Sequence, residues 1–197
     1  MKVLVGCEFS GVVRDAFLER GHDAWSCDLL PCEADPSRHI QGDVLSVISD
    51  GWDLAIFHPP CQYLSSSGMH WTTRGIRDKK HTEDALKFVE LLLAAPIPRI
   101  ALENPVGAIS TRIRKWDQII QPWFFGDDAS KKTCLWLKNL PPLADTNRLP
   151  GDSKTRRANQ TPSGQNKLGP SADRWKLRSA TYPGIAAAMA DQWGGLS

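Results

Sequence analysis

One stretch, residues 53–62, constrains the fold of this chain more than any other. It begins with an acid, continues as a short apolar run and ends in His-Pro-Pro-Cys-Gln. The apolar run is typical of a buried strand, and the prolines must end it, because proline has no ladder donor and forces the preceding residue into an extended conformation. We therefore expect Cys61 at the carboxyl end of a buried strand, where open α/β sheets bind their ligands.

Two interpretations of Cys61 are open from this stretch alone. The residue is either a positioned thiol nucleophile or a small buried side chain beside a loop. A lone Pro-Pro-Cys favours the second interpretation, since an unpaired cysteine usually belongs to the core. The other motifs of the chain must decide between them.

Length and composition limit the class of protein. A chain of 197 residues with 41% hydrophobic content can bury one substantial core, which predicts a single domain over 1–197. A net charge of +2 does not by itself indicate a nucleic-acid partner. Five cysteines without zinc-type spacing indicate a reducing compartment and no metal site. No apolar run reaches the ~20 residues of a membrane span, and we expect a cytoplasmic protein of a bacterial or phage-infected cell, without a membrane partner.

The amino-terminal segment predicts a strand, a turn and a helix. Residues 2–5 are apolar enough for a strand, 6–11 contain the turn, and a helical pattern starts at Val12. Free amides at a helix start suit a nucleotide-like cofactor. The glycines do not form Gly-x-Gly-x-x-Gly, so a dinucleotide fingerprint is not supported, and an ordinary α/β connection accounts for the turn equally well.

Two acids follow this unit at positions suited to a nucleoside. Asp28 ends a second predicted strand, 22–27, roughly 20 residues after the glycine turn, where a carboxylate can accept hydrogen bonds from both ribose hydroxyls. Asp43 stands in a loop before an apolar pair and could accept from an exocyclic amine. As alternatives, both acids could be helix caps or turn residues.

After Cys61 we expect a polar loop over 63–77, followed by a helix over 82–93. The loop mixes hydroxyls, aromatic rings and arginines, which suits contact with phosphates and bases. The alternative is an inert connector, although such a connector need not be so long or so aromatic.

Residues 99–105 repeat the pattern of an apolar strand ended by a proline, and they bring Glu103 and Asn104 to the strand end. Neighbouring strands would present Cys61 and Glu103 at the same edge of the sheet. A carboxylic acid in such a partly apolar site could hold its proton near neutral pH and protonate a ring nitrogen. The alternative is that Glu103 and Asn104 cap a helix starting at Pro105.

The carboxyl-terminal third predicts two strands, an irregular arm and a last helix. The strands are expected over 119–125 and 133–137, the second of them antiparallel at the sheet edge. Residues 141–170 are rich in Pro, Gly, Asn, Ser and Thr with mostly basic charges, which suits either a phosphate-contacting arm or a solvated linker. Thr181 and Pro183 open a helix that should pack against the first strand.

Taken in order, these motifs resemble those of the DNA cytosine-C5 methyltransferases, and the chain looks like a compact phage or prophage member of that family. Pro-Pro-Cys-Gln together with Glu-Asn carries most of the resemblance, which covers the chain apart from 141–170. The matching segments are 8–11, Asp28, 42–44, 59–62, 103–105 and 181–190.

The resemblance implies a class I S-adenosylmethionine-dependent methyltransferase fold, which is a Rossmann-like α/β fold with a mostly parallel sheet and an antiparallel edge strand. It implies a DNA (cytosine-5-)-methyltransferase in which the Cys61 thiolate adds to C6, Glu103 protonates N3, and C5 receives a methyl group from S-adenosyl-L-methionine. The target base lies inside the stack of a duplex, so the substrate would be DNA with a flipped cytosine or single-stranded DNA.

The resemblance also assigns binding residues. The cofactor would contact Phe9, Gly11, Asp28, Asp43 and Pro59. We also expect the substrate to contact Gln62, Ser65, Asn104, Lys131 and Lys132, and the basic arm 141–170 to contribute Arg156 and Arg157.

The chain departs from the family pattern at three places. Glu8 and Ser10 occupy the glycine places of Phe-x-Gly-x-Gly, residues 130–132 replace Gln-x-Arg-x-Arg, and 141–170 stands where a large target-recognition domain is usual. These departures keep two alternatives open: the same chemistry on RNA, single-stranded DNA or a nucleotide, and a non-catalytic nucleic-acid-binding module that retains the fold. An amino-group methyltransferase is disfavoured, because that chemistry needs no thiol.

Overall fold

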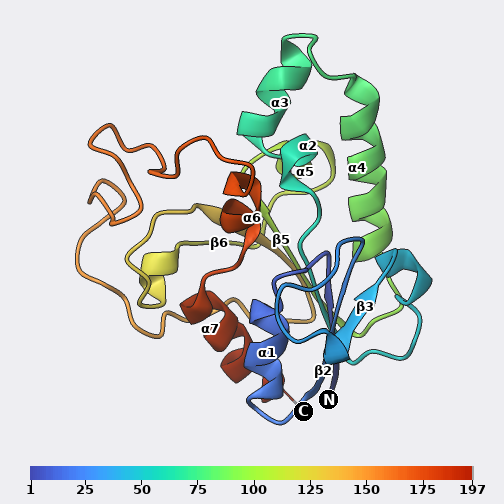
Figure 1. Ribbon diagram of the computed structural model, residues 1–197. Coiled ribbons are helices and arrows are strands. Elements are labelled where there is room, and N and C mark those ends of the chain that lie inside the picture. The colour runs from blue at the N-terminus through green and yellow to red at the C-terminus, as the bar shows by residue number, and fades with distance from the viewer. Residues whose placement is uncertain (197) are drawn as a thin grey trace.

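The computed structural model describes residues 1–196, which build a seven-stranded sheet in the order β3-β2-β1-β4-β5-β7-β6 (Figure 1). The strands are β1 (Lys2–Gly6), β2 (Asp23–Asp28), β3 (His39–Gln41), β4 (Leu54–Phe57), β5 (Arg99–Pro105), β6 (Gln118–Ile120) and β7 (Thr133–Lys138). Strands β1 to β5 pair in parallel, and β7 runs antiparallel to both of its neighbours. The predicted mostly parallel α/β sheet is confirmed, and the antiparallel strand lies one place inside the edge that β6 forms.

Helices cover both faces of the sheet. The longer ones are α1 (Val12–Leu18), α3 (Ser66–Thr73), α4 (Lys79–Leu93) and α7 (Pro183–Gly194), and the shorter ones are α2 (Cys61–Leu64), α5 (Ala108–Arg112) and α6 (Arg174–Ser179). Short 3-10 turns lie at Pro36–Arg38, Val44–Ser46 and Pro122–Phe124. None of the described helices is long and apolar enough to span a lipid bilayer.

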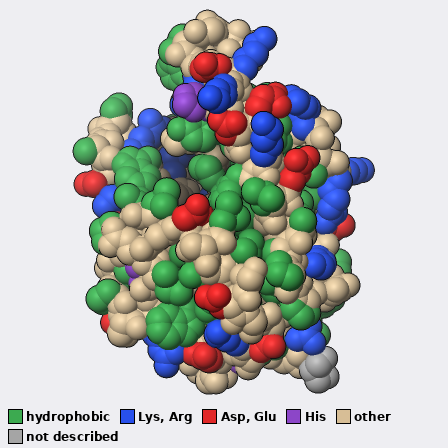
Figure 2. Space-filling view, turned by 90° about the vertical axis from the view of Figure 1, so that its right-hand side faces the viewer, with side chains coloured by type: hydrophobic (Ala, Val, Ile, Leu, Met, Phe, Trp, Pro, Cys, Tyr) green, Lys and Arg blue, Asp and Glu red, His purple; other side chains and the backbone are tan. Residues whose placement is uncertain are grey.

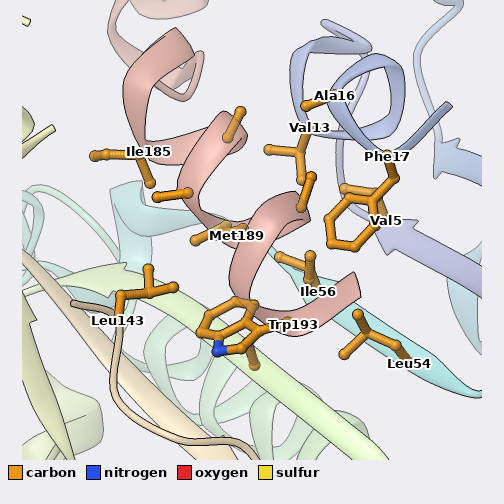
Figure 3. Close-up of a cluster of buried hydrophobic side chains, with 14 of the residues drawn as sticks. Val5, Val13, Ala16, Phe17, Leu54, Ile56, Leu143, Ile185, Met189 and Trp193 are labelled. Carbon is orange, nitrogen blue, oxygen red and sulfur yellow. The ribbon is translucent and has the colours of Figure 1, made fainter. Parts of the chain in front are cut away.

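The core consists of two buried clusters, one on each face. Side chains alternate along a strand, so Val3 and Val5 of β1 belong to one cluster and Leu4 to the other. The first cluster lies under α1 and α7, where Met189 and Trp193 pack on the sheet (Figure 3). The second lies under α4 and α5. The expectation that the last helix packs against the first strand is confirmed.

The segment after Cys61 differs from the expected loop. Residues 61–73 form α2 and α3, because the Ser65 hydroxyl accepts the Gly68 amide at 3.1 Å and caps α3. Helix α4 likewise starts before the expected residue 82, since the Asp78 carboxylate accepts the Lys80 amide at 2.9 Å. Together α3 and the start of α4 project beyond the sheet (Figure 1).

Two expectations for the last third are corrected in detail. The strand expected over 119–125 covers only β6, because Pro122 starts a 3-10 turn. The last helix is preceded by Tyr182 without a side-chain cap, so Thr181 does not cap it, and Pro183 occupies the first turn as expected. The arm 141–170 contains no helix or extended strand.

Candidate active site

Strand register places the two expected reactive groups at one edge of the sheet. Phe57 of β4 lies opposite Leu102 of β5, and the next residues along the chain are His58 and Glu103. The backbone then turns through Pro59 and Pro60 into α2, whose first residue is Cys61. Cys61 is exposed, whereas Glu103 is 9% exposed. An accessible thiol and a buried carboxyl group therefore lie at the carboxyl ends of adjacent parallel strands.

Glu103 has a hydrogen-bonded partner that the sequence analysis did not assign. The His58 Nδ1 atom lies 3.0 Å from Oε2 of Glu103. Burial raises the pKa of Glu103, but the positive charge of Lys131 and the hydrogen bonds with His58 and Thr133 outweigh burial and hold the pKa below its ordinary value. The groups around Glu103 therefore favour its ionised form, whereas the sequence analysis considered a carboxyl group that could hold its proton near neutral pH.

The thiol of Cys61 experiences opposing influences. Although the residue is exposed, the packing around its sulfur raises the thiol pKa, and the negative charge of Glu103 raises it further. Positive charges on Lys131 and Arg178 lower it, but the pKa remains above the ordinary value. The reactive thiolate is thus a minor form at neutral pH, and the two cations are the groups that stabilise it.

Lys131 connects the two reactive residues, since its charge acts on both Cys61 and Glu103. Its ammonium group donates to the carbonyl of Ala180 at 3.3 Å, and its backbone amide donates to the side chain of Gln121 at 3.0 Å. A small recess surrounds it, lined by Glu103, Lys131, Thr133, Thr181, Tyr182 and Ile185. The neighbouring Lys132 is exposed and faces solvent.

A set of buried contacts holds the backbone that carries Cys61. Asn104 is 1% exposed, and its Nδ2 donates to the carbonyl of Pro59 at 2.8 Å. Ser65 is buried as the cap of α3, and Gln62 is exposed with its carbonyl bonded to Arg77. Asn104 and Ser65 therefore stabilise the backbone on either side of Cys61. The exposed side chain of Gln62 is free to contact a substrate.

The turn after β1 is built around Glu8 rather than around glycines. Gly11 has a φ of 76°, a left-handed conformation that glycine adopts without strain. The Glu8 carboxylate accepts the amide of Val13 at 2.7 Å and that of Arg14 at 3.3 Å, so it satisfies the first turn of α1. Glu8 is buried, and burial raises its pKa. The amides expected to meet a cofactor are already bonded within the chain.

Phe9 lies beneath the helix α6. It is 8% exposed, and its ring centroid is 5.6 Å from that of Trp175. Lys176 of the same helix forms an ion pair with Glu33 at 2.9 Å. Because Arg178 acts on Cys61, α6 reaches from the turn after β1 to the thiol.

Asp28 and Asp43, the two acids predicted to bind a nucleoside, each accept a backbone amide two residues further along the chain. Asp28 ends β2, accepts the Leu30 amide at 2.9 Å through one oxygen, and has its pKa raised by burial. Asp43 is exposed and accepts the Leu45 amide at 3.0 Å. Leu29, which is 72% exposed, offers an apolar surface beside Asp28. Both acids make the turn and cap contacts that were the alternative interpretation, and a nucleoside-binding role for them stays a prediction.

The two arginines assigned to the substrate lie in different surroundings. Arg156 is exposed. Arg157 is 5% exposed, its guanidinium lies 4.5 Å from the ring centroid of Trp123, and Asp128 is 3.9 Å away. Arg157 thus anchors the arm 141–170 to the body of the protein, and only Arg156 faces solvent.

Sequence reasoning missed His58, Trp175 and Arg178. The signal for His58 was its place immediately before the two prolines, where the strand register requires it to meet the neighbouring strand. Nothing in the sequence predicts that α6 packs over Phe9, which lies more than a hundred positions earlier. Among residues 1–196 no group of three His, Cys, Asp or Glu side chains could hold a metal ion.

Of the comparisons with known proteins, only the one with solved structures bears on the fold. No protein-family model matches the chain, and no curated protein matches it in sequence. Among solved structures it is similar to the Entamoeba histolytica methyltransferase EhMeth, with 14% identity and a TM-score of 0.53 over 76% of this chain and 57% of that one. It also matches a prophage-encoded E. coli protein described as a DNA modification methyltransferase, with 15% identity and a TM-score of 0.44 over 70% of this chain and 46% of that one.

The chain thus spans about half the length of the solved structures it matches. At this identity the likeness to EhMeth concerns the fold alone. Together with the strand order and the antiparallel β7, it shows that the protein has the class I S-adenosylmethionine-dependent methyltransferase fold.

Proposed function

We propose that this protein transfers a methyl group from S-adenosyl-L-methionine to C5 of cytosine in DNA. The observation that carries the proposal is an accessible Cys61 beside the buried Glu103 at the carboxyl edge of a class I methyltransferase sheet. Carbon-5 of cytosine is a poor nucleophile until another nucleophile adds to C6, and sulfur can both add and leave. Methylation of an amino group needs no such thiol.

The residues of the site have separate roles in this reaction. The Cys61 sulfur bonds to C6 while N3 takes a proton through Glu103, which makes C5 nucleophilic. Lys131 and Arg178 stabilise the thiolate before it adds. S-adenosylmethionine, when bound, supplies an electrophilic methyl group. A base then takes the C5 hydrogen as a proton, Cys61 leaves as a thiolate, N3 returns its proton to Glu103, and the ring regains its aromaticity.

Asp28, Asp43 and Leu29 would hold the adenosine part of the cofactor, since carboxylates suit its hydroxyls and amine. Phe9, Gly11 and Pro59 would contact the same cofactor.

The projecting end of α3 supports a nucleic-acid substrate. Trp71 and Ile76 are 48% and 65% exposed, and the exposed Arg74 and Lys79 stand beside them. Figure 2 shows Lys, Arg and His side chains on this projecting end, with Asp and Glu side chains among them. An enzyme that acts on a stacked base must extract it, and apolar side chains flanked by cations suit contact with bases and phosphates.

DNA containing 5-fluorocytosine tests the proposal. Fluorine cannot leave C5 as a proton does, so the adduct through Cys61 should persist in a denaturing gel when labelled S-adenosylmethionine is present. Cys61→Ala should abolish the adduct, and Cys32→Ala, which changes a half-buried cysteine, should retain it. Adduct formation with RNA alone would change the substrate class. Absence of any adduct with duplex DNA, single-stranded DNA and RNA would refute the proposal.

A further inference from the structure

His58 is held in a fixed position between three strand ends. Its backbone amide donates to the carbonyl of Gly6 at 2.9 Å, which ties it to β1, and Pro59 follows it directly. The side chains of His58 and Glu103 are 10% and 11% exposed. The 3.0 Å contact between Nδ1 and Oε2 is therefore shielded from water, where a hydrogen bond to a charged group is strong.

The imidazole is surrounded by ionisable groups from several elements. Glu8 from the turn after β1, Asp28 from β2 and Glu103 from β5 all experience its charge, because a protonated His58 lowers the pKa of each. On the far side of Glu103 lies Lys131, the other cation that acts on this carboxylate. The second ring nitrogen, Nε2, is buried and has no hydrogen-bond partner within the described part of the chain.

The proposed reaction leaves a difficulty that His58 resolves. N3 of the cytosine must gain a proton when Cys61 adds to C6, yet Glu103 is surrounded by groups that favour its ionised form. A carboxylate without a proton cannot donate one. A group that can return protons to Glu103 must therefore contact it, and His58 is hydrogen-bonded to it.

We propose that His58 is a positioning residue that supplies Glu103 with the proton for N3. The inference rests on the proposed cytosine-C5 chemistry. The proton moves from Nδ1 of the imidazolium to the Glu103 carboxylate, and from the carboxyl group to N3, which leaves a neutral imidazole. When Cys61 departs and N3 releases its proton, the same path restores the imidazolium, so the cycle consumes no proton at this site.

If His58 only held Glu103 in place, its proton would take no part in the reaction. A neutral imidazole with a proton on Nδ1 can hold Glu103 by the same hydrogen bond without ever releasing that proton. The substitution His58→Asn separates the two roles, because the asparagine amide can donate from nearly the same place but does not titrate. His81→Asn is the matched control, since His81 is exposed and stacks on Tyr63 away from Glu103.

The experiment is the pH dependence of single-turnover methyl transfer to DNA across the range in which imidazole titrates, about pH 5 to 8. Because the pKa of the Cys61 thiol is raised, ionisation of this thiol alone makes the rate rise with pH throughout this range. A reaction that also needs an imidazolium should rise only at the lower end of the range and then level off, since the gain in thiolate and the loss of imidazolium cancel. His58→Asn should rise throughout the range without levelling off, and at the lower end of the range it should be slower than wild type by about tenfold to 100-fold, near the lower end of general acid–base effects. His81→Asn should keep the wild-type profile.

Three outcomes would overturn the inference. One is a His58→Asn enzyme with the wild-type rate and the same levelling-off, and another is a wild-type rate that rises throughout the range, which needs no variant to fold. The third is equal loss of the levelling-off in His81→Asn. Failure of the proposed function looks different, because wild type would then form no adduct with 5-fluorocytosine and transfer no methyl group at any pH.

Discussion

The bond between Asn104 and Pro59 allows a prediction with a worked magnitude. Asn104 is 1% exposed, and its amide is the donor that satisfies the Pro59 carbonyl. Asn104→Ala leaves that carbonyl unpaired, which costs about 1–3 kcal/mol when the group is buried. The Oδ1 atom of Asn104 is itself buried without a partner in the described structure, and its removal offsets part of this cost. We expect a net loss of about 1–2 kcal/mol of unfolding free energy.

Asn104→Asp should lower the free energy of unfolding more than Asn104→Ala does, although it changes the volume of the side chain little. It replaces the donor by a carboxylate oxygen that faces the Pro59 carbonyl, and an unpaired charge in such a place costs about 3–5 kcal/mol. Asn139 supplies the control, because its amide donates to the Pro98 carbonyl at the same 2.8 Å in exposed surroundings. Asn139→Asp should therefore lose much less stability.

Urea unfolding followed by tryptophan fluorescence measures these differences, and the rate of 5-fluorocytosine trapping measures the effect on Cys61. Since Pro59 lies two residues before Cys61, a loosened loop should slow trapping. The reasoning is refuted if Asn104→Ala has the urea midpoint and trapping rate of wild type. It is also refuted if Asn104→Asp is no less stable than Asn139→Asp.

Three further changes test other parts of the site. Lys131→Met removes one of the two cations that lower the pKa of Cys61, so alkylation of this thiol, followed by mass spectrometry, should require a higher pH, and an unchanged profile would contradict the assignment. Trp71→Ala should weaken DNA binding by about tenfold, as loss of one base-stacking contact of ~1–3 kcal/mol does, with cofactor binding intact by calorimetry. Asp28→Ala should reduce S-adenosylmethionine affinity by about tenfold or more, whereas Asp35→Ala on the exposed loop should leave it unchanged.

The strands that build the centre of the sheet could be predicted from the sequence. Strands β1, β4 and β5 are short apolar runs ended by glycine or proline, a pattern typical of strands buried on both faces. Strands β3 and β6 span only His39–Gln41 and Gln118–Ile120, too short for a periodic pattern to appear. Helix α3 was hidden for another reason, since its residues are mostly polar and only one of them, Thr72, is buried.

The positions of Cys61 and Glu103 could be predicted because each belongs to a strand end that is marked by proline. The protonation state of Glu103 could not be predicted, because it depends on Lys131 and His58, which approach from other elements. The role of α6 was equally hidden. Its short length and lack of buried residues give no pattern, and its contact with Phe9 depends on the path of the whole arm.

The pairing of His58 with Glu103 follows from the apolar residues beneath them. Phe57 and Leu102 are both fully buried and lie opposite each other, so the packing of the second core cluster fixes the register of β4 and β5. A slip of one residue would turn every side chain of a strand to the other face and separate the imidazole from the carboxylate. The chemistry at the strand ends is therefore specified by the core, and the buried side chains below the site set its geometry as firmly as the polar groups within it.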